Sequence, residues 1–260
     1  MLLAPVVWAL TVVIIYFFAA KTWWLPLPIS EHGAAYDVQF VRTLIVTGVV
    51  FFLAQAALGY VIIRFRDNGG RAQYLHGNNK MEAIWTTATA ILFIGLAIMS
   101  TRIWASVHFQ QGPPDAIPIQ VLGKQFAWSF RYPGPDGKFG RTDIKLINDA
   151  AGNPFGIDDR DPAGRDDIVS ASIKVPAGKD VKLILQSRDV IHNFFVRELR
   201  LKQDLVPGME IPFHFRADKP GVYEVPCSEL CGLGHHQMRS TLEVMPEADF
   251  ESWKKQQAAL

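Results

Sequence analysis

The chain has 260 residues and a formal net charge of +1, enough for one ordinary domain with further segments. The near-neutral charge excludes a typical nucleic-acid-binding protein, which carries a strong basic surplus. Apolar residues make up 49% of the chain, and the longest apolar runs all lie before residue 102.

Three uncharged apolar stretches predict membrane helices, at residues 4–20, 43–63 and 83–101. A helix that crosses a bilayer core needs roughly 20 apolar residues. The second and third stretches reach that length and are bounded by the charged residues Arg42, Arg64, Glu82 and Arg102. Buried helices of a soluble core are the alternative, but a domain of this size rarely holds helices that are apolar on every face. We therefore expect a transmembrane helix hairpin within residues 38–111.

The first stretch leaves two interpretations open. A secretory signal starts with basic residues, and none precedes Ala4. Trp23 and Trp24 follow Lys21, as in a membrane helix that ends in an interfacial aromatic belt. We expect residues 1–37 to form an extra transmembrane helix with an outer loop, and a cleaved signal segment is the alternative.

Loop charges predict how these helices are oriented. Residues 64–80 carry four basic residues against one acid, whereas residues 21–42 carry only Lys21 and Arg42 as basic residues. The positive-inside rule places residues 64–80 in the cytoplasm and residues 21–42 outside. The third helix then delivers the rest of the chain to the outer face. We expect a multi-pass protein of a bacterial plasma membrane with a periplasmic domain, since the extra helix and a long insertion favour a bacterial over a mitochondrial membrane.

The pattern after residue 112 changes to short runs of β-branched and aromatic residues separated by Pro, Gly and Asp. Such runs are typical of strands, and we expect them at residues 117–122, 125–132, 170–175, 181–186, 210–215, 221–225 and 241–244. Strands without helical periodicity predict a sandwich or a small barrel. Residues 133–167 are rich in Gly, Pro and Asp and predict a surface insertion, and residues 247–260 predict a C-terminal helix.

A run of potential metal ligands extends from Cys227 to Met238, with the sequence Cys-Ser-Glu-Leu-Cys-Gly-Leu-Gly-His-His-Gln-Met. Thiolate, thioether and imidazole ligands together select copper, or less often zinc. One Cys with two His and a weak Met would suit a single blue copper ion. Here Cys231 adds a second thiolate, and two thiolates with two imidazoles can bridge a pair of copper ions. His235 supplies one imidazole, and His192 is the nearest upstream candidate for the other.

Simpler explanations of this loop exist. Two cysteines in an oxidising compartment usually form a disulfide, but His235 and Met238 add two further ligands to the same loop. A structural zinc site of two Cys and two His is a second alternative, and it would leave Met238 unexplained. Taken alone, His192 would be an ordinary half-buried histidine. We expect His236 to point elsewhere and assign no role to His32, His76, His108 and His214, which lack soft neighbours in sequence.

The loop from Cys227 to Met238 resembles the binuclear copper (CuA) loop of cytochrome c oxidase subunit II, including the Ser-Glu-Leu between the cysteines. Upstream, three segments are similar to the family's first-histidine strand and the turn after it: Asp189-Val190-Ile191-His192, Leu201-Lys202-Gln203-Asp204 and Pro207-Gly208. Glu82-Ala83-Ile84-Trp85-Thr86 resembles the start of the second leg of the family's helix hairpin. The resemblance implies a membrane-anchored all-β protein with a cupredoxin-like β-sandwich at residues 112–246.

The resemblance also implies a role for each matching ligand. Cys227 and Cys231 would bridge the two copper ions, and His192 and His235 would each bind one of them. Met238 would be the weak ligand of one ion.

Two acidic residues receive roles in the same way. The backbone carbonyl of Glu229 would be the weak ligand of the other copper ion, and its side chain would bind a magnesium ion at the boundary with subunit I. Glu82 would lie at the cytoplasmic entrance of a proton pathway into subunit I. An acid at this place is also simply favourable with the dipole of a helix N-terminus.

The implied function is electron transfer into a haem–copper terminal oxidase that reduces oxygen to water and translocates protons. Its partners would be subunit I, subunit III, membrane lipid and a cytochrome c or similar one-electron donor. The chain has no Cys-x-x-Cys-His haem-attachment motif, so the donor is a separate protein. The alternatives are a CuA-bearing nitric oxide reductase of the same superfamily and a membrane-tethered copper-delivery protein. A quinol-oxidising relative is disfavoured because such subunits lack the thiolates.

Three departures from the family concern the electron donor. The family's electron-accepting segment has two Trp flanking a Tyr, whereas this chain has Phe126-Ala127-Trp128, so either Phe126 or Trp128 could accept the electron. Arg197 and Arg239 stand where many members carry Pro, and added positive charge weakens docking of a basic cytochrome. The acids of the insertion at residues 133–167 could restore an acidic docking face, or be the ordinary charges of a solvated loop.

Overall fold

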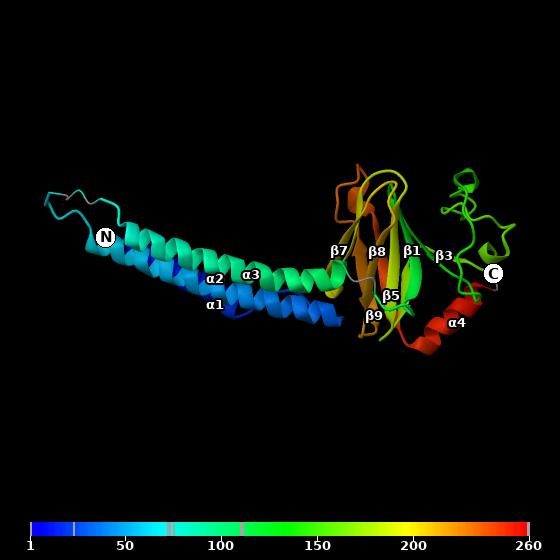
Figure 1. Ribbon diagram of the computed structural model, residues 1–260, viewed down its shortest axis with the longest axis horizontal. Helices are drawn as coiled ribbons and strands as arrows, with labels where there is room; N and C mark the ends of the chain where they lie inside the picture. The colour runs from blue at the N-terminus through cyan, green and yellow to red at the C-terminus, as the bar shows by residue number, and fades with distance from the viewer. Residues whose placement is uncertain (1, 23, 72–73, 75, 110–111, 259–260) are drawn as a thin grey trace. The chain divides into compact units, whose positions relative to one another are not determined.

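The computed structural model describes residues 2–22, 24–71, 74, 76–109 and 112–258 (Figure 1). They form two compact units. The membrane unit consists of Met1–Pro26 and Asp37–Arg102, and the outer unit of Leu27–Tyr36 and Ile103–Leu260. Trp23, part of the predicted aromatic belt, lies outside the described residues.

The expected helix hairpin is confirmed. Helices α2 (Glu31–Arg64) and α3 (Asn79–His108) are long and apolar enough to cross a membrane. Both extend beyond their apolar stretches, with acidic residues in the first turns and basic residues in the last. This arrangement is favourable with the helix dipole. Inside the membrane unit, Gln39 Nε2 donates to Ser100 Oγ at 3.2 Å and links the two helices.

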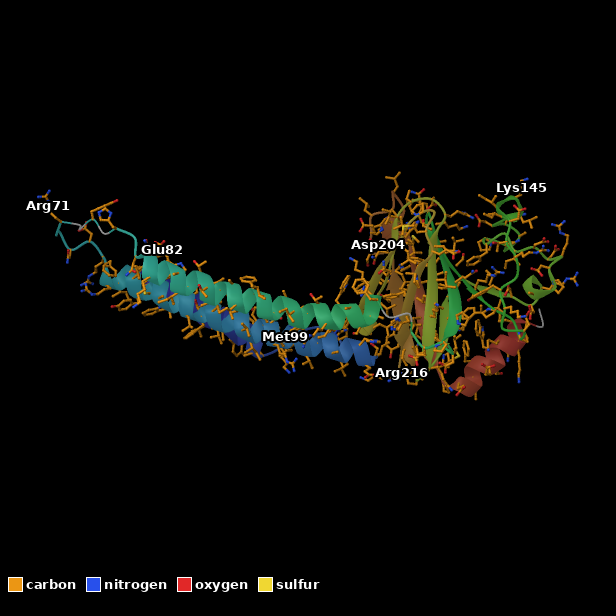
Figure 2. The ribbon with its side chains drawn as sticks, viewed as in Figure 1. Arg71, Glu82, Met99, Lys145, Asp204 and Arg216 are labelled. Carbon is orange, nitrogen blue, oxygen red and sulfur yellow. The ribbon has the colours of Figure 1, made fainter. Side chains whose placement is uncertain are left out.

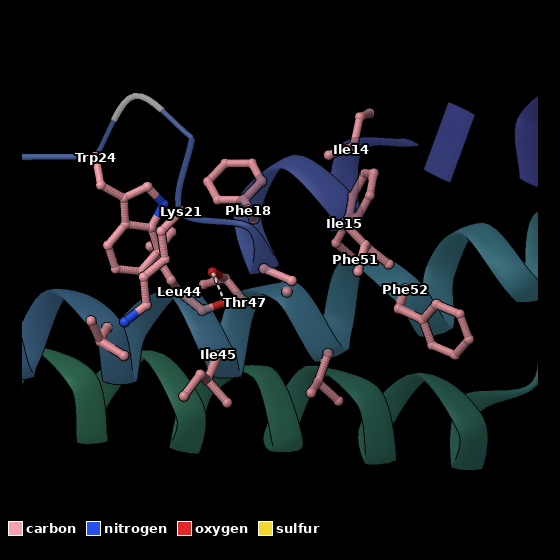
Figure 3. A pocket seen from close by; sticks show the side chains of 14 residues that line it. Ile14, Ile15, Phe18, Lys21, Trp24, Leu44, Ile45, Thr47, Phe51 and Phe52 are labelled. Carbon is pink, nitrogen blue, oxygen red and sulfur yellow. Dashed lines mark hydrogen bonds between the residues drawn. The ribbon is translucent and has the colours of Figure 1, made fainter. Parts of the chain in front are cut away.

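Helix α1 (Leu3–Ala19) is apolar but shorter than the other two. A Cβ atom at Gly59 would lie 2.1 Å from Trp8 Nε1, so this glycine lets the indole approach α2 closely. Further along α1, an apolar groove of about 850 Å³ lies between the two helices (Figure 3). Its lining includes Phe18, Leu44 and Lys21. That α1 spans the membrane stays a prediction.

The described strands of the outer unit form three sheets, in agreement with the predicted β-sandwich. The five-stranded sheet has the order β3-β2-β1-β5-β8, the three-stranded sheet β4-β10-β9, and β6 pairs with β7. The strands are β1 Ile117–Lys124, β2 Ala127–Tyr132, β3 Ile168–Ser170, β4 Ile173–Pro176, β5 Asp180–Ser187, β6 His192–Val196, β7 Leu201–Leu205, β8 Ile211–Arg216, β9 Gly221–Pro226 and β10 Arg239–Met245.

The core of the outer unit follows from strand alternation. Burial alternates along β5, so Val181, Leu183 and Leu185 face inward. Parallel pairing of β1 with β5 places Ile119 beside Leu183, and antiparallel pairing places Phe213 of β8 on the other side of Leu183. These buried side chains form one hydrophobic cluster with residues of the other sheets.

Two strand predictions were wrong. The single strand expected at residues 170–175 is divided into β3 and β4, which belong to different sheets. The Ser170 hydroxyl bonds to the backbone of Ser172 in both directions, and this side-chain turn redirects the chain. Strands β6 and β7 were not among the strands predicted from residue patterns, and only the resemblance implied a strand near His192. The residues of β6 are nearly all buried and those of β7 include polar ones, so neither shows a clear alternation.

The insertion at residues 133–167 and the C-terminal helix both pack against the β-domain. The insertion contains two short 3-10 helices, Ile144–Leu146 and Pro162–Gly164. It is tied to β2 by an ion pair between Arg131 and Asp167, both of which are buried side chains. The C-terminal helix α4 (Glu247–Gln257) packs its Trp253 ring against Tyr132, with ring centroids 5.0 Å apart.

Candidate metal centre

Backbone hydrogen bonds bring the cysteine loop, which connects β9 to β10, onto strand β6. Phe194 and Cys227 form an isolated β-bridge, and Ser228 N donates to Asn193 O at 3.1 Å. The loop is closed on itself by Cys227 N, which donates to Met238 O at 2.9 Å. His192 is the first residue of β6, so this pairing sets its imidazole beside the cysteines.

The predicted ligands converge on one point. One ligand atom from each of His192, Cys227 and Cys231 lies within 4.8 Å of the other two. Cys231 Sγ is 3.6 Å from His235 Nδ1 and 3.7 Å from Met238 Sδ. Five side chains therefore surround a single space.

The two thiols and the Glu229 carbonyl lie next to one another. Cys227 Sγ is 3.9 Å from Cys231 Sγ and 3.2 Å from the backbone oxygen of Glu229. A disulfide requires about 2.05 Å between the sulfur atoms, so both cysteines are free thiols here. The disulfide alternative is therefore wrong for this structure.

The ligand cluster is shielded from water on most sides. His192 is fully buried, and Cys227, Cys231 and Met238 are each less than a tenth exposed. The side chain of Glu229 is exposed instead. An apolar surround of this kind limits solvent access and tunes the properties of a bound metal.

A hydrogen-bond chain outside the ligands fixes the His192 ring. His192 Nε2 lies 2.8 Å from Asp189 Oδ1, which leaves Nδ1 facing Cys227 Sγ at 3.9 Å. Gln125 N donates to Asp189 Oδ2 at 2.7 Å, and the Gln125 side chain donates to Cys231 O at 2.6 Å. The prediction missed both Asp189 and Gln125. Only the position of Asp189 three residues before His192 could have indicated it.

The thiols have unequal acidity. Burial raises the pKa of Cys227, but its contacts with His192 and with nearby backbone amides outweigh burial and lower it to about 6. Burial and the negative charge of Cys227 raise the pKa of Cys231 to about 11. One thiolate thus forms readily near neutral pH, and metal binding is needed to deprotonate the second.

The donor set fits copper. Two thiols, two imidazoles and a thioether are soft or borderline ligands, which copper prefers. Tetrahedral zinc would use four of them and leave the Met238 sulfur, buried 3.7 Å from Cys231 Sγ, without a function. His236 is exposed and does not belong to the ligand cluster.

The two candidate electron-accepting aromatics occupy different environments. Trp128 is only 3% exposed and packs edge-on against His192, with ring centroids 6.1 Å apart. Phe126 is 39% exposed, and its ring lies against the cysteine loop. A Cβ atom at Gly234 would come within 2.4 Å of that ring. Phe126 is therefore the aromatic that a docking protein can reach.

The insertion contacts the rim of this site through one acid. Asp149 accepts from Arg188 at 2.7 Å and pairs with Lys124, also at 2.7 Å. Lys124 and Arg188 directly precede Gln125 and Asp189 in the chain. Asp149 thus neutralises basic residues at the rim, which neither of the two explanations of the insertion's acids had anticipated.

Glu82 belongs to the membrane unit, whereas the ligand cluster belongs to the outer unit. It is exposed in the first turn of α3 (Figure 2). The turn is capped by Asn78 Oδ1, which accepts from Lys80 N and Met81 N at 3.1 Å. This position suits a helix N-terminal acid and leaves its role in proton uptake a prediction.

Comparison with known proteins gives two family matches. The cytochrome C oxidase subunit II periplasmic domain matches residues 117–245, and the transmembrane domain of the same subunit matches residues 35–103. The chain is 35% identical over 247 residues to the alternative cytochrome c oxidase subunit 2 of Bradyrhizobium diazoefficiens, which covers 94% of this chain and 87% of the relative.

Two further relatives are similar. Identity to cytochrome c oxidase subunit 2 of Thermostichus vulcanus is 32% over 261 residues, covering 91% of this chain and 79% of the relative. The crystal structure of the periplasmic domain of subunit II of cytochrome oxidase from Bradyrhizobium japonicum is 28% identical, with a TM-score of 0.42. That alignment covers 57% of this chain and 96% of the crystallised one.

Proposed function

Because this chain belongs to the cytochrome c oxidase subunit II family, we propose that it accepts electrons from a one-electron donor at a binuclear copper centre and serves a haem–copper oxidase. The chain is part of an oxidoreductase complex and is anchored in a membrane by α2 and α3. The oxygen-reducing site would lie in subunit I, with subunit III as a further partner.

The observation that carries the proposal is the convergence of five side-chain ligands and one carbonyl on a shielded space. Cys227 and Cys231 would bridge two copper ions, and His192 and His235 would bind one each. Met238 and the carbonyl of Glu229 would be the weak ligands. Two copper ions, when bound, supply one-electron chemistry in which the electron is shared by both.

The surroundings of the cluster suit an electron-transfer protein. Asp189 holds the His192 ring in one orientation, so little side-chain movement is expected when the charge of the site changes. Phe126 lies at the surface against the loop, and Leu233 of the same loop is 98% exposed. A cytochrome c or similar donor would dock over this apolar surface.

The remaining assignments concern the partner subunits and the membrane. The exposed carboxylate of Glu229 would contribute to a magnesium site at the boundary with subunit I, since carboxylates are preferred ligands of this ion. Glu82 would admit protons from the cytoplasm for oxygen reduction and proton translocation. The outer unit would then lie in the periplasm of a bacterium.

The decisive experiment is electron paramagnetic resonance of the full-length chain, purified in detergent and loaded with copper. A seven-line hyperfine pattern, from one electron shared by two copper nuclei, is the expected result. The Cys231→Ser variant should lose that pattern. A four-line spectrum, or a colourless zinc-binding protein, would overturn the proposal in favour of copper delivery or a structural metal. Measuring whether the purified complex consumes oxygen or nitric oxide then identifies the terminal electron acceptor.

A further inference from the structure

The apolar groove between α1 and α2 has a shape and a charge that point to a ligand. Side chains of both helices line its volume of about 850 Å³, and all of them belong to the membrane unit. Figure 3 shows Lys21 and Trp24 at one end of the groove and Phe51 and Phe52 at the other. Water does not fill an apolar space of this kind, because the walls offer it too few polar partners. An apolar molecule or segment therefore occupies the groove in a membrane.

The length of the groove fits one leaflet of a bilayer. Its lining on α2 extends from Val41 to Phe52, and at 1.5 Å per residue these positions span about 16 Å. This is close to half of a bilayer core, which is about 30 Å thick. A membrane-spanning helix of a partner would need a groove along the whole core, whereas an acyl chain of one leaflet needs only half of it.

A second, smaller hollow adjoins the groove. It has a volume of about 440 Å³ and shares Phe18, Trp24 and Leu44 with the groove. The Trp24 ring packs edge-on against Phe40 of α2, with ring centroids 6.3 Å apart, so the indole is held against this helix. The two hollows meet at the end of the groove where Trp24 lies. Two apolar hollows that meet at one end match a phospholipid, in which two acyl chains join one headgroup.

Two basic residues provide positive charge at this end. Lys21 Nζ lies 5.4 Å from the centroid of the Trp24 ring, within the range of a cation–π contact. Tryptophan is enriched at the headgroup level of membranes, so we expect this pair at that level. Arg42 lies three residues before Ile45 and seven before Val49, and therefore on the same face of α2 as these two lining residues. Lys21 and Arg42 are exposed, and among the described residues neither has an ion-pair partner.

The backbone of Lys21 adopts a conformation that favours glycine. Its φ of 53° lies in the left-handed region. Lys21 N donates to Phe18 O at 3.1 Å and Thr22 N to Phe17 O at 3.2 Å, which is the helix C-terminal cap where glycine is the usual residue. A side chain is strained there, and strained residues of this kind gather at functional sites. A cation at a helix C-terminus is favourable in any case, but its place over Trp24 also directs it to the groove.

We propose that this groove binds one anionic phospholipid, whose acyl chains lie along α1 and α2 and whose phosphate pairs with Lys21 and Arg42. The apolar lining supplies van der Waals contacts to the chains. The two cations attract a headgroup of net negative charge and repel the choline of a zwitterionic lipid. Free phosphate would gain nothing from the apolar lining. The bound lipid would fill the space between the helices and so join α1 to the hairpin of α2 and α3.

The test is native mass spectrometry of the full-length chain in detergent, titrated with phosphatidylglycerol or with phosphatidylcholine of the same acyl chains. We expect one tightly bound phosphatidylglycerol per chain and weaker binding of phosphatidylcholine. Lys21→Gly should weaken phosphatidylglycerol binding by about fivefold, the effect of one basic residue near an anionic headgroup. Glycine suits the left-handed cap, so this variant should resist heat at least as well as the parent. Lys80→Gln, at an exposed lysine of α3 outside the groove, should leave binding unchanged.

A second pair of variants tests the groove itself. A Cβ atom at Gly48, which lines the groove, would meet no atom within 4 Å, and the same holds for Gly95 of α3, which does not line it. Leucine is therefore accommodated at both positions. Gly48→Leu should displace at least two methylene groups of an acyl chain and weaken phosphatidylglycerol binding by about tenfold. Gly95→Leu should not change the affinity.

Each contrary result has a distinct meaning. Equal affinity for the two lipids, or an unchanged affinity in Lys21→Gly, overturns recognition of an anionic headgroup. Equal affinities in Gly48→Leu and Gly95→Leu overturn the groove as the binding site. In the assembled complex, a photo-crosslinking amino acid at Ile45 should label phosphatidylglycerol. Labelling of a partner subunit instead would overturn the proposal in favour of a groove filled by a protein helix.

Discussion

Asp189 and His192 form a hydrogen-bonded pair in which Asp189 Oδ1 lies 2.8 Å from His192 Nε2. The pair fixes the ring so that Nδ1, at 3.9 Å, faces the sulfur of Cys227. Asp189 is itself held by the backbone N–H groups of Gln125 and Val190, both at 2.7 Å. The carboxylate therefore orients a metal ligand without touching the metal site.

Removing this carboxylate should weaken copper binding. In Asp189→Ala the imidazole can rotate and its Nε2 loses a partner, so copper affinity should fall by about 10- to 100-fold. Chelator competition followed by the visible absorption of the copper centre measures the change. Asp136→Ala, which removes an exposed acid of the insertion, should have no effect. An unchanged affinity in Asp189→Ala would show that packing alone orients the ring.

Truncation of Phe126 should slow electron transfer from the donor without altering the copper spectrum. An aromatic anchor at the centre of an interface contributes about 2 kcal/mol, or about thirtyfold in affinity. Stopped-flow reduction by cytochrome c should show this loss in Phe126→Ala. Ile144→Ala, at an exposed apolar position of the insertion, is the matched control. If Trp128→Phe slows reduction and Phe126→Ala does not, the accessible ring is not the acceptor.

The stability contributed by Asp149 should depend on pH. Hydrogen bonds from Arg188 and Lys124 hold the pKa of this carboxyl well below its ordinary value. A depressed folded-state pKa stabilises the protein above the unfolded value, about 3.9, and the stabilisation is lost as the pH falls toward the folded value. The side chain is 41% exposed, so the effect is at most about 1 kcal/mol.

Thermal unfolding followed by near-UV circular dichroism tests this dependence. Asp149→Asn should lower the midpoint near pH 7, and the difference from the parent should shrink as the pH drops below about 4. High salt should reduce the difference as well, because the pair is partly exposed. A difference that stays constant with pH would mean that Asp149 acts through packing rather than through its charge.

Removing only one partner of the buried ion pair of Arg131 and Asp167 should strongly lower the free energy of unfolding. Arg131 also donates to Gln120 at 3.0 Å and to Gly140 O at 2.6 Å, so its charge cannot leave the interior. Asp167→Ala should destabilise the outer unit by about 3–5 kcal/mol, whereas replacing both residues by apolar ones should cost much less. Denaturant unfolding of Asp167→Ala and of the Arg131→Met/Asp167→Leu double variant measures both. Equal losses would show that the pair is not the anchor of the insertion.

The proton-uptake role of Glu82 predicts a separation of two readouts. Glu82→Gln in the assembled complex should lower steady-state oxygen consumption and leave the copper spectrum and the reduction rate by the donor unchanged. Asp67→Asn changes another exposed acid on the same side of the membrane unit and should leave turnover unaffected. Full turnover in Glu82→Gln would show that Glu82 acts only as a favourable charge at a helix N-terminus.

The sequence was most informative where one segment carries its own signal. The hairpin could be predicted from the length of its apolar stretches. The cysteine loop could be predicted as a metal site because it contains two Cys, His235 and Met238 within one short segment. Its partner His192 could be proposed as a candidate, but only the pairing of Phe194 with Cys227 sets the imidazole beside the thiols. That pairing is a tertiary contact, and no local pattern encodes it.

The features that could not be predicted depend on neighbours distant in sequence. Strand β6 is buried on both faces, so the alternation that reveals a half-buried strand is absent. The break between β3 and β4 depends on the Ser170 hydroxyl, which an apolar count does not register. His32 and His214 had no soft neighbours in sequence and were given no role, yet the fold brings the two rings together edge to face.

The backbone bonds that dock the cysteine loop on β6 also bear on when the site could take up metal. Peptide groups of Cys227, Ser228 and Met238 make these bonds, so the loop is held by contacts that no ligand side chain supplies. His192 and the cysteines lie far apart in the chain and meet where β6 pairs with the loop, so an unfolded chain offers no complete set of ligands. Under the proposed function, we therefore expect copper to enter after the outer unit has folded rather than to nucleate its folding.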